Sequence, residues 1–400
     1  MSSSDIAIVG MACIFPGAKD LSQFWFNIVN GVDFTTESSP KHPDTEEYIP
    51  LNLSSLIDTA LKDADITWDD ETQAGADLII HWAGYPDKNL NSFFAENKSF
   101  SNLIKTGYII NDIHASPLIA VKQAINRLRQ GHCDVAIVGG IYTHDKYSCT
   151  LELEKIISPC IDGISISWGA GVVVLKREED AKHCNNRMYA IIKGAQIKPE
   201  TIGYLEADAI VIGNTKKAGI ETLKSFFDQR HKEKTICPVG SIKSMIGHTI
   251  SAAGIASLIK VALCLSNKII PPAINCDKTK IKLKDAPFYI NTQIYPWIHD
   301  ISLAPRRAAI NILGFNETGI HLVLEEVPEK KGKSFMREIK PGLEWETDLI
   351  VFSARDLTEL LVKIQKLQQF LEKNQMDLQL EDIAYTQYLH FVESYPHLMA

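Results

Sequence analysis

The sequence lacks the features that mark several specialised classes of protein. Its 400 residues carry 41 Lys and Arg against 49 Asp and Glu, a net charge of −8, so it has no excess of positive charge for nucleic acid or an anionic membrane surface. Its 8 cysteines are dispersed, with no CxxC pair and no zinc-like Cys/His spacing. We therefore expect no nucleic-acid partner, no metal, and reduced thiols in a cytoplasmic compartment.

Export and membrane signals are scarce as well. The first five residues contain no basic segment of a signal peptide, and the apolar runs stay shorter than the roughly 18 residues that cross a bilayer. What the sequence does contain is 45% hydrophobic and 22% charged residues, which is close to the average for folded proteins. At roughly 100–200 residues per domain, the length allows two or three domains, and we expect no membrane span.

Short apolar runs alternate with helical patterns along most of the chain. Apolar residues at 3-4 spacing predict helices at 118–128 and 220–227, and the segment 252–265, apolar nearly all round, predicts a helix buried between layers. Strands alternating with helices indicate an α/β fold. Runs rich in β-branched residues predict strands at 5–14, which is apolar on both faces, and at 77–82, 134–139, 171–175, 189–192, 209–212, 308–312 and 320–324.

Two further patterns concern the organisation of the chain. Residues 114–140 and 237–265 are weakly similar, since each combines a histidine, an apolar helix and a neighbouring short strand, and this predicts a duplicated architecture. A charged segment at 325–345 with Pro and Gly predicts a linker. A strand at 348–352 and an amphipathic helix at 357–371 follow, and Ser353 with Asp356 is predicted to form the capping box that begins this helix.

Four motifs point to one family. They are DIAIVGMACIFPGAKDLSQFWFNIVNG at 5–31, GHCDVAIVGG at 131–140, VGSIKSMIGHTISAAGIASLIK at 239–260 and INILGFNETGIHLVLEE at 310–326. Together they resemble the opening, the strand after the nucleophile helix, the Lys/His motif and the closing segment of the β-ketoacyl synthase (ketosynthase) domains of polyketide and fatty acid synthases.

The resemblance implies a fold and a division into domains. The family has a thiolase-like α/β fold, a duplicated α-β-α-β-α arrangement of layers, which we expect at residues 1–326. A linker at 327–347 then leads to residues 348–400, which look like the start of the small α/β linker domain between a ketosynthase and an acyltransferase.

The resemblance also implies a chemistry. In the family a cysteine thiolate at the start of a buried helix takes an acyl group from the phosphopantetheine arm of an acyl carrier protein. Two histidines then stabilise the enolate that forms when the malonyl group loses CO2. No metal and no bound cofactor are implied. The expected partners are an acyl carrier protein and a second ketosynthase chain, in a homodimer or in a heterodimer with an intact ketosynthase.

The aligned sequence departs from this pattern at its catalytic positions. The nucleophile motif aligns to 111–118, which puts His114 in the position of the cysteine. The first family histidine aligns to Asp208, and an ionised carboxylate only accepts hydrogen bonds and would repel an enolate. Lys243 and His248 of the third motif are retained.

The closing motif is altered too. Gly314 and Phe315 match the family, but Asn316 replaces its next glycine and crowds the backbone donor expected in the oxyanion hole. Stretches after residue 32, within 158–169 and within 197–202 are shorter than in the family, which uses parts of them for dimer contacts and for the walls of the acyl tunnel.

Three functions remain open at this point. The chain is a non-elongating component, similar to a chain-length factor or serving as a carrier-protein docking domain, or it is a malonyl-thioester decarboxylase that uses His114 and His248. The third is an active ketosynthase with a relocated nucleophile, for which Cys160 is the candidate. Against these stand plain structural roles, in which His114 caps a helix, His248 shapes a buried turn and Cys133 fills the core.

Overall fold

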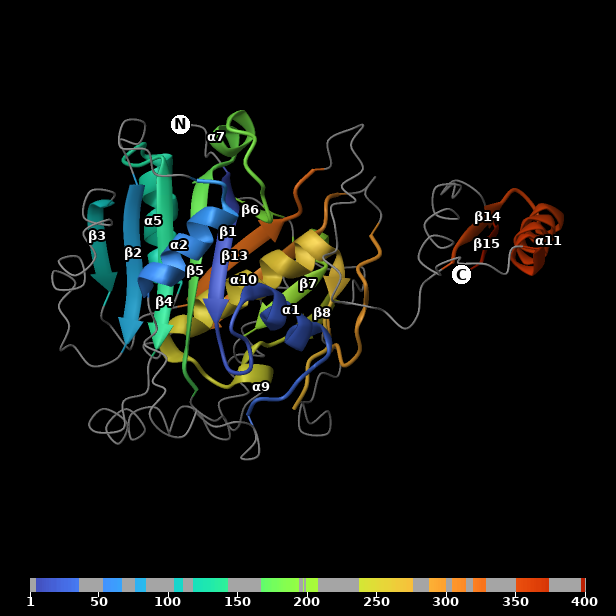
Figure 1. The fold of residues 1–400 in the computed structure, drawn as a ribbon, viewed down its shortest axis with the longest axis horizontal. Coiled ribbons are helices and arrows are strands. Elements are labelled where there is room, and N and C mark those ends of the chain that lie inside the picture. Colours follow the sequence, from blue (N-terminus) through green and yellow to red (C-terminus); the bar gives the residue numbers. More distant parts are fainter. Residues whose placement is uncertain are drawn as a thin grey trace. The chain divides into compact units, whose positions relative to one another are not determined.

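The computed structural model divides the chain into two compact units, Met1–Glu329 and Lys330–Ala400 (Figure 1). The boundaries at 326/327 and 347/348 stay predictions, because most of the predicted linker lies outside the described residues. The structure describes residues 5–35, 53–66, 76–83, 104–110, 118–142, 167–193, 197, 199–207, 237–275, 288–299, 304–313, 319–328, 350–373 and 397–399, and all structural statements below concern these.

A continuous 11-stranded sheet forms the frame of the first unit. The strands predicted for this unit are confirmed with shifts of up to three residues at their ends, except the one at 209–212, which lies outside the described residues. In spatial order the strands are β10 (Phe288–Ile290), β8 (Cys237–Gly240), β7 (Tyr204–Ala207), β12 (Arg307–Leu313), β13 (Gly319–Glu325), β6 (Ala190–Ile192), β1 (Ile6–Ile14), β5 (Gly169–Arg177), β4 (Val135–Tyr142), β2 (Ala76–Ala83) and β3 (Ile104–Ile110).

The pairing pattern repeats in the two halves of this sheet. In the first half β3, β2 and β4 run parallel, β5 pairs antiparallel with β4, and β1 pairs antiparallel with β5. In the second half β8, β7 and β12 run parallel, β13 pairs antiparallel with β12, and β6 pairs antiparallel with β13. The halves meet where β1 pairs antiparallel with β6. The duplicated α/β architecture expected from the sequence is therefore confirmed.

The helices occupy corresponding places in the two halves. Helix α5 (Ile119–Arg129) lies in the chain between β3 and β4, and α10 (Ala253–Asn267) lies between β8 and β12. The other helical elements that the described residues of this unit form are α1 (Leu21–Val29), α2 (Leu53–Asp63), α7 (Glu178–His183), α9 (Lys243–Ile246) and the 3-10 turns η1 (Pro199–Thr201) and η2 (Ile250–Ala252).

Helix α10 is the central helix, as its apolar sequence predicts. It contacts β1, β4 and β5 of the first half and β6, β12 and β13 of the second (Figure 1). The segment Ile250–Asn267 has 18 residues and a mean hydropathy of 1.6, so its length and composition would allow a membrane span, which the sequence analysis had excluded. In the fold 89% of it is buried, as expected for the core helix of a folded domain.

Paired glycines let this helix approach the sheet. Gly140 of β4 pairs with Gly171 of β5, and both face the beginning of α10. A Cβ atom on Gly140 would lie 2.6 Å from the carbonyl oxygen of Ser251, and one on Gly171 would lie 2.6 Å from Cγ2 of Ile255. Any larger residue would push the helix away from the sheet.

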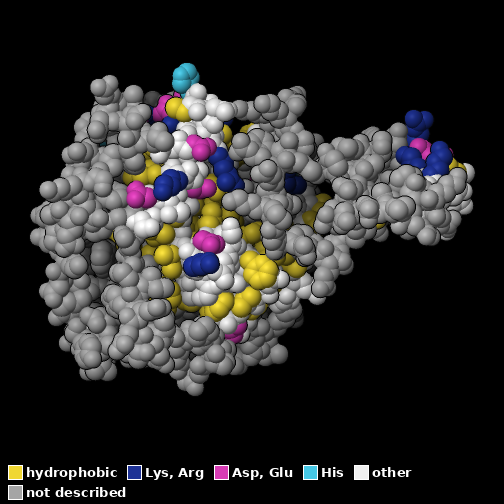
Figure 2. Space-filling model, in the orientation of Figure 1, with side chains coloured by type: hydrophobic (Ala, Val, Ile, Leu, Met, Phe, Trp, Pro, Cys, Tyr) yellow, Lys and Arg dark blue, Asp and Glu magenta, His cyan; other side chains and the backbone are white. Residues whose placement is uncertain are grey.

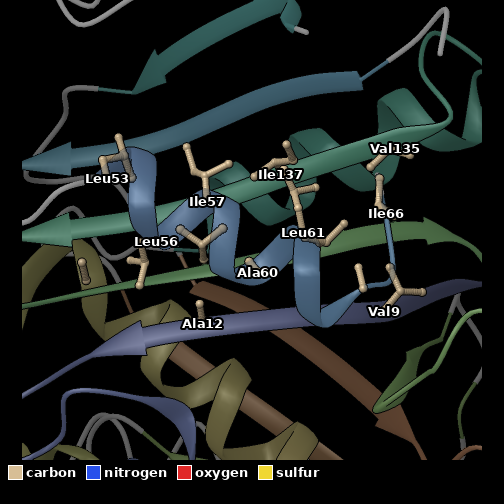
Figure 3. Packing of buried hydrophobic residues seen from close by; sticks show 14 of the residues in the cluster. Val9, Ala12, Leu53, Leu56, Ile57, Ala60, Leu61, Ile66, Val135 and Ile137 are labelled. Carbon is tan, nitrogen blue, oxygen red and sulfur yellow. The ribbon is translucent and has the colours of Figure 1, made fainter. Parts of the chain in front are cut away.

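Helix α2, which the sequence does not predict, covers β1 and β5 on the face of the sheet opposite to α10. Ile57, Ala60 and Leu61 are buried against the strands (Figure 3), and Gly10 leaves room for the carbonyl oxygen of Ala60, since a Cβ there would lie 2.2 Å from it. Exposed residues of α2 are polar, and charges of both signs are intermixed over this face (Figure 2).

Truncating a side chain in this cluster should reveal how tightly it is packed. Ile57 is fully buried, so Ile57→Ala should lower the free energy of unfolding by about 2–5 kcal/mol, because it removes apolar contacts and leaves a cavity. The matched variant Ile298→Ala, at a side chain that is 83% exposed, should change it by less than about 0.5 kcal/mol. Urea titration followed by circular dichroism measures both values. Equal losses would contradict the packing described here.

The second unit contains β14 (Phe352–Ala354), which pairs antiparallel with β15 (His397–Met399), and α11 (Leu357–Lys373). The strand predicted at 348–352 is wrong in its bounds, because residues 350 and 351 are not part of a strand and β14 begins at Phe352.

The predicted Ser353–Asp356 capping box is wrong as well. Ser353 lies buried in β14, and the cap is Asp356, whose carboxylate accepts from the backbone N–H of Glu359 at 2.8 Å. The Glu359 side chain in turn accepts from the backbone N–H of Arg355 at 3.0 Å. Helix α11 begins at Leu357, so its N-cap residue is Asp356, and the partner in the capping box is the residue three positions after the cap, Glu359.

Candidate functional site

The structure describes only part of the site predicted from the sequence, and the catalytic roles of all its residues stay predictions. Lys243 and His248 are described, and the fold brings them together. The other candidates lie outside the described residues, and their roles stay predictions: His114, Cys160, Asp208, Gly314, Phe315 and Asn316.

The turn from β8 into α10 places the two described side chains. The short helix α9 carries Lys243 at its start and ends at Gly247, whose φ of +77° costs a glycine little. The N–H of Gly247 donates to the carbonyl oxygen of Lys243 at 3.1 Å, and His248 follows directly. Lys243 Nζ therefore lies 2.9 Å from His248 Nε2, and the two residues are only 4% and 7% exposed.

A strained residue fixes the orientation of the imidazole. Ile250 has a φ of +44°, which a β-branched residue rarely adopts, and it is buried at the start of the central helix. In this conformation its backbone N–H donates to Nδ1 of His248 at 3.0 Å. A ring nitrogen that accepts a hydrogen bond carries no proton, so the proton of the neutral ring is on Nε2.

Burial, and then the positive charge of Lys243, hold the pKa of His248 well below its ordinary value of 6.5. The ring is thus neutral near pH 7. Its Nε2–H and the Lys243 ammonium group, 2.9 Å apart, are then both donors and do not bond to each other, whereas a negatively charged oxygen lying beside both would accept from each. The pair is therefore suited to stabilising an oxyanion. Because the ring is neutral, it has no imidazolium proton to donate and is a poor general acid.

Two segments that the sequence analysis did not assign to the site support α9. The N–H of Phe34 donates to the carbonyl oxygen of Met245 at 2.8 Å. Asn275 Nδ2 donates to the carbonyl oxygen of Ser244 at 3.0 Å and to Asp33 Oδ2 at 2.9 Å. No signal in the sequence links these segments, because residues 33 and 275 are far apart in the chain.

The buried neutral histidine should make stability depend on pH. Its pKa is lowered in the folded state, so below about pH 6.5 the unfolded chain binds the extra proton and the free energy of unfolding falls as the pH falls. Its slope should reach about 1.4 kcal/mol per pH unit for this group.

The variant His248→Gln should therefore flatten the decline between pH 6.5 and 5, as measured by urea titration at several pH values. His183→Asn, at an exposed histidine, is the matched control and should keep the slope of the unmodified protein. An unchanged slope in His248→Gln would show that this imidazole titrates normally in the folded state.

Comparison with known proteins identifies the family. The profile of the β-ketoacyl synthase N-terminal domain matches residues 3–75 and 113–181, and that of the β-ketoacyl synthase C-terminal domain matches residues 160–277. Together they span more than half of the chain. The chain belongs to the β-ketoacyl synthase family. The retained Lys243–His248 pair lies within the part that matches the C-terminal domain.

Relatives of known sequence are much longer than this chain. Polyketide synthase PksL of Bacillus subtilis is 26% identical over 482 residues, which cover 95% of this chain and 10% of that protein. A polyunsaturated fatty acid synthase of Thraustochytrium sp. is 26% identical over 370 residues, 78% of this chain and 13% of that protein. The alignment with PksL is longer than this chain, so it contains gaps.

Solved structures share the fold. The ketosynthase from module 6 of the bacillaene synthase of Bacillus subtilis matches with a TM-score of 0.66 and 24% identity, over 96% of this chain and 80% of that one. The oxazolomycin ketosynthase domain OzmH KS7 of Streptomyces albus matches with a TM-score of 0.67 and 20% identity, over 96% and 84%. The thiolase-like fold expected from the sequence is thereby confirmed.

Proposed function

We propose that this chain is a ketosynthase-like component of a polyketide or fatty-acid-type synthase that does not complete the condensation. It would act as a non-elongating partner, similar to a chain-length factor, or as a docking domain for a carrier protein. The observation that carries the proposal is the alignment of His114 with the nucleophilic cysteine. An acylated imidazole reacts quickly with water, so it is poorly suited to holding a growing chain.

The other substitutions support the same proposal. Asp208 aligns with the first catalytic histidine, and a carboxylate there would oppose the negative charge of an enolate. Asn316 replaces a glycine of the closing motif and adds a side chain next to the expected backbone donor. Loss of the nucleophile and of one histidine removes both acyl transfer and half of the enolate stabilisation.

The proposal includes its partners. The substrate carrier would be the phosphopantetheine arm of an acyl carrier protein, presented in the cytoplasm, with no metal or bound cofactor in this chain. The dimer partner would be another copy or an intact ketosynthase. Residues 348–400 would begin the linker domain that leads toward an acyltransferase. Since the chain spans about a tenth of the length of PksL, the acyl substrate and the carrier depend on the rest of such an assembly.

The test is direct acylation. Purified protein incubated with acyl- and malonyl-carrier protein should give neither an acyl-enzyme by intact mass nor a 3-ketoacyl product by chromatography. His114→Cys restores a thiol at the aligned position and should gain one acyl adduct. The double variant His114→Cys/Asp208→His should additionally gain product, because both missing groups return.

A stable acyl adduct on the unmodified protein would contradict the proposal. Peptide mapping then separates the alternatives, because an adduct at Cys160, with loss of product after iodoacetamide treatment, would establish an active ketosynthase with a relocated nucleophile.

A second function, decarboxylation of a malonyl thioester, is favoured by the Lys243–His248 geometry. Loss of CO2 leaves a negative charge on the thioester oxygen, and such an oxygen lying beside both His248 Nε2–H and the Lys243 ammonium group would accept from each. This step needs no nucleophile in the protein. His114 could supply a further hydrogen bond to the carbonyl.

Release of CO2 from malonyl-carrier protein measures this activity. His248→Ala should reduce the rate by about 100-fold, as expected for the loss of one oxyanion donor. His183→Asn is the matched control and should keep the rate, since His183 is exposed on α7. Equal rates in the unmodified protein and His248→Ala would exclude decarboxylation at this site.

A further inference from the structure

A fully buried ion pair is hydrogen-bonded to the residue that precedes Lys243. Lys260 Nζ, on the central helix α10, is 2.8 Å from Oε2 of Glu206 on β7, and the two side chains are 0% and 2% exposed. A lysine is unexpected on a helix that is otherwise apolar, and burying two charges costs several kcal/mol per ion before their attraction repays it. An apolar side chain of similar size at position 260 would serve the packing of this helix at least as well.

The carboxylate of Glu206 has two further partners among the described residues. Its Oε2 accepts from the hydroxyl of Tyr204 at 2.9 Å, and its Oε1 accepts from the backbone N–H of Ile242 at 2.6 Å. Tyr204 is fully buried as well, and burial and then the charge of Glu206 raise the pKa of its hydroxyl well above 10.0, so it remains a donor. Each partner comes from a different stretch of the chain.

The Ile242 contact is the one that reaches the site. Ile242 immediately precedes Lys243, and its N–H lies at the start of α9, where the backbone donors of a helix have no partner within the helix. The carbonyl oxygen of Ile242 accepts from the backbone N–H groups of Met245 and Ile246, so the position of Ile242 fixes the position of α9. A shift of Ile242 would move the Lys243 ammonium group relative to the imidazole of His248.

A glycine in the neighbouring strand leaves room for this cluster. Gly240 is the last residue of β8, and a Cβ atom on it would lie 2.4 Å from the Tyr204 hydroxyl and 3.3 Å from Lys260 Nζ. Only a glycine lets the chain pass the cluster at this distance. The carboxylate thus links β7, the turn between β8 and α9, and α10.

We propose that Glu206 is a positioning residue: through its hydrogen bond to Ile242 and its ion pair with Lys260, it holds α9 and α10 so that Lys243 Nζ stays against His248 Nε2. It acts on the site through the backbone and touches no substrate. This positioning role concerns the site of the proposed function. Its test needs no substrate, so its outcome does not depend on whether the protein has the proposed activity.

The test follows the imidazole of His248 in histidine-labelled protein by ¹⁵N NMR, with His248→Gln to identify its signals. In the unmodified protein these signals should remain those of the neutral ring with its proton on Nε2 well below pH 6.5. Glu206→Gln should raise the titration midpoint by about one pH unit, a tenfold change in protonation, because Lys243 moves away from the ring.

Glu325→Gln is the matched control. Glu325 of β13 is also a buried carboxylate, and it pairs with Lys193 at 3.2 Å and with Arg307 at 2.7 Å, but none of its described contacts reaches α9. This variant should lose thermal stability and leave the His248 signals unchanged. A purely structural role for Glu206 predicts that Glu206→Gln behaves in the same way, and that result would overturn the proposal.

Tyr204→Phe keeps the test decisive if Glu206→Gln does not fold. It removes only the hydroxyl donor to Glu206, so it should shift the His248 midpoint in the same direction by a smaller amount. A folded Tyr204→Phe protein with unchanged His248 signals, in the absence of a folded Glu206→Gln, would also overturn the proposal.

Discussion

The close contact between the start of α10 and the paired glycines of β4 and β5 is the constraint on which the rest of the first unit depends. Gly140 and Gly171 let the helix come near the sheet of the first half, while its other contacts reach the sheet of the second half. One helix thereby joins the two halves. The residues before it, including His248 and the strained Ile250, are placed at the junction as a consequence.

Two polar side chains at this junction are tied to the backbone. His248 accepts from the N–H of Ile250, and Glu206 accepts from the N–H of Ile242. Charges buried this deeply persist only when they are paired, because an unpaired charge in a low-dielectric interior is very costly. The Lys243–His248 pair is therefore held in a rigid, preorganised frame, which is the condition under which donors stabilise an oxyanion most effectively.

Much of the frame could be predicted from local sequence. Runs of β-branched residues locate β1, β4, β5, β12 and β13, and the apolar segment at 252–265 locates the central helix. Helix α2 was not predicted, although its buried positions follow the 3-4 spacing of an amphipathic helix. The capping residue of α11 was misplaced by three positions, since the pattern alone does not show where a helix begins.

For the site, the sequence by itself determined which residue types stand at the family's positions: His114 and Asp208 in place of a cysteine and a histidine, with Lys243 and His248 retained. Only the tertiary structure decided that Lys260 pairs with Glu206 and that Asn275 binds Asp33. Such pairs join residues that are far apart in the chain, and their identity depends on how the two halves of the sheet pack around α10.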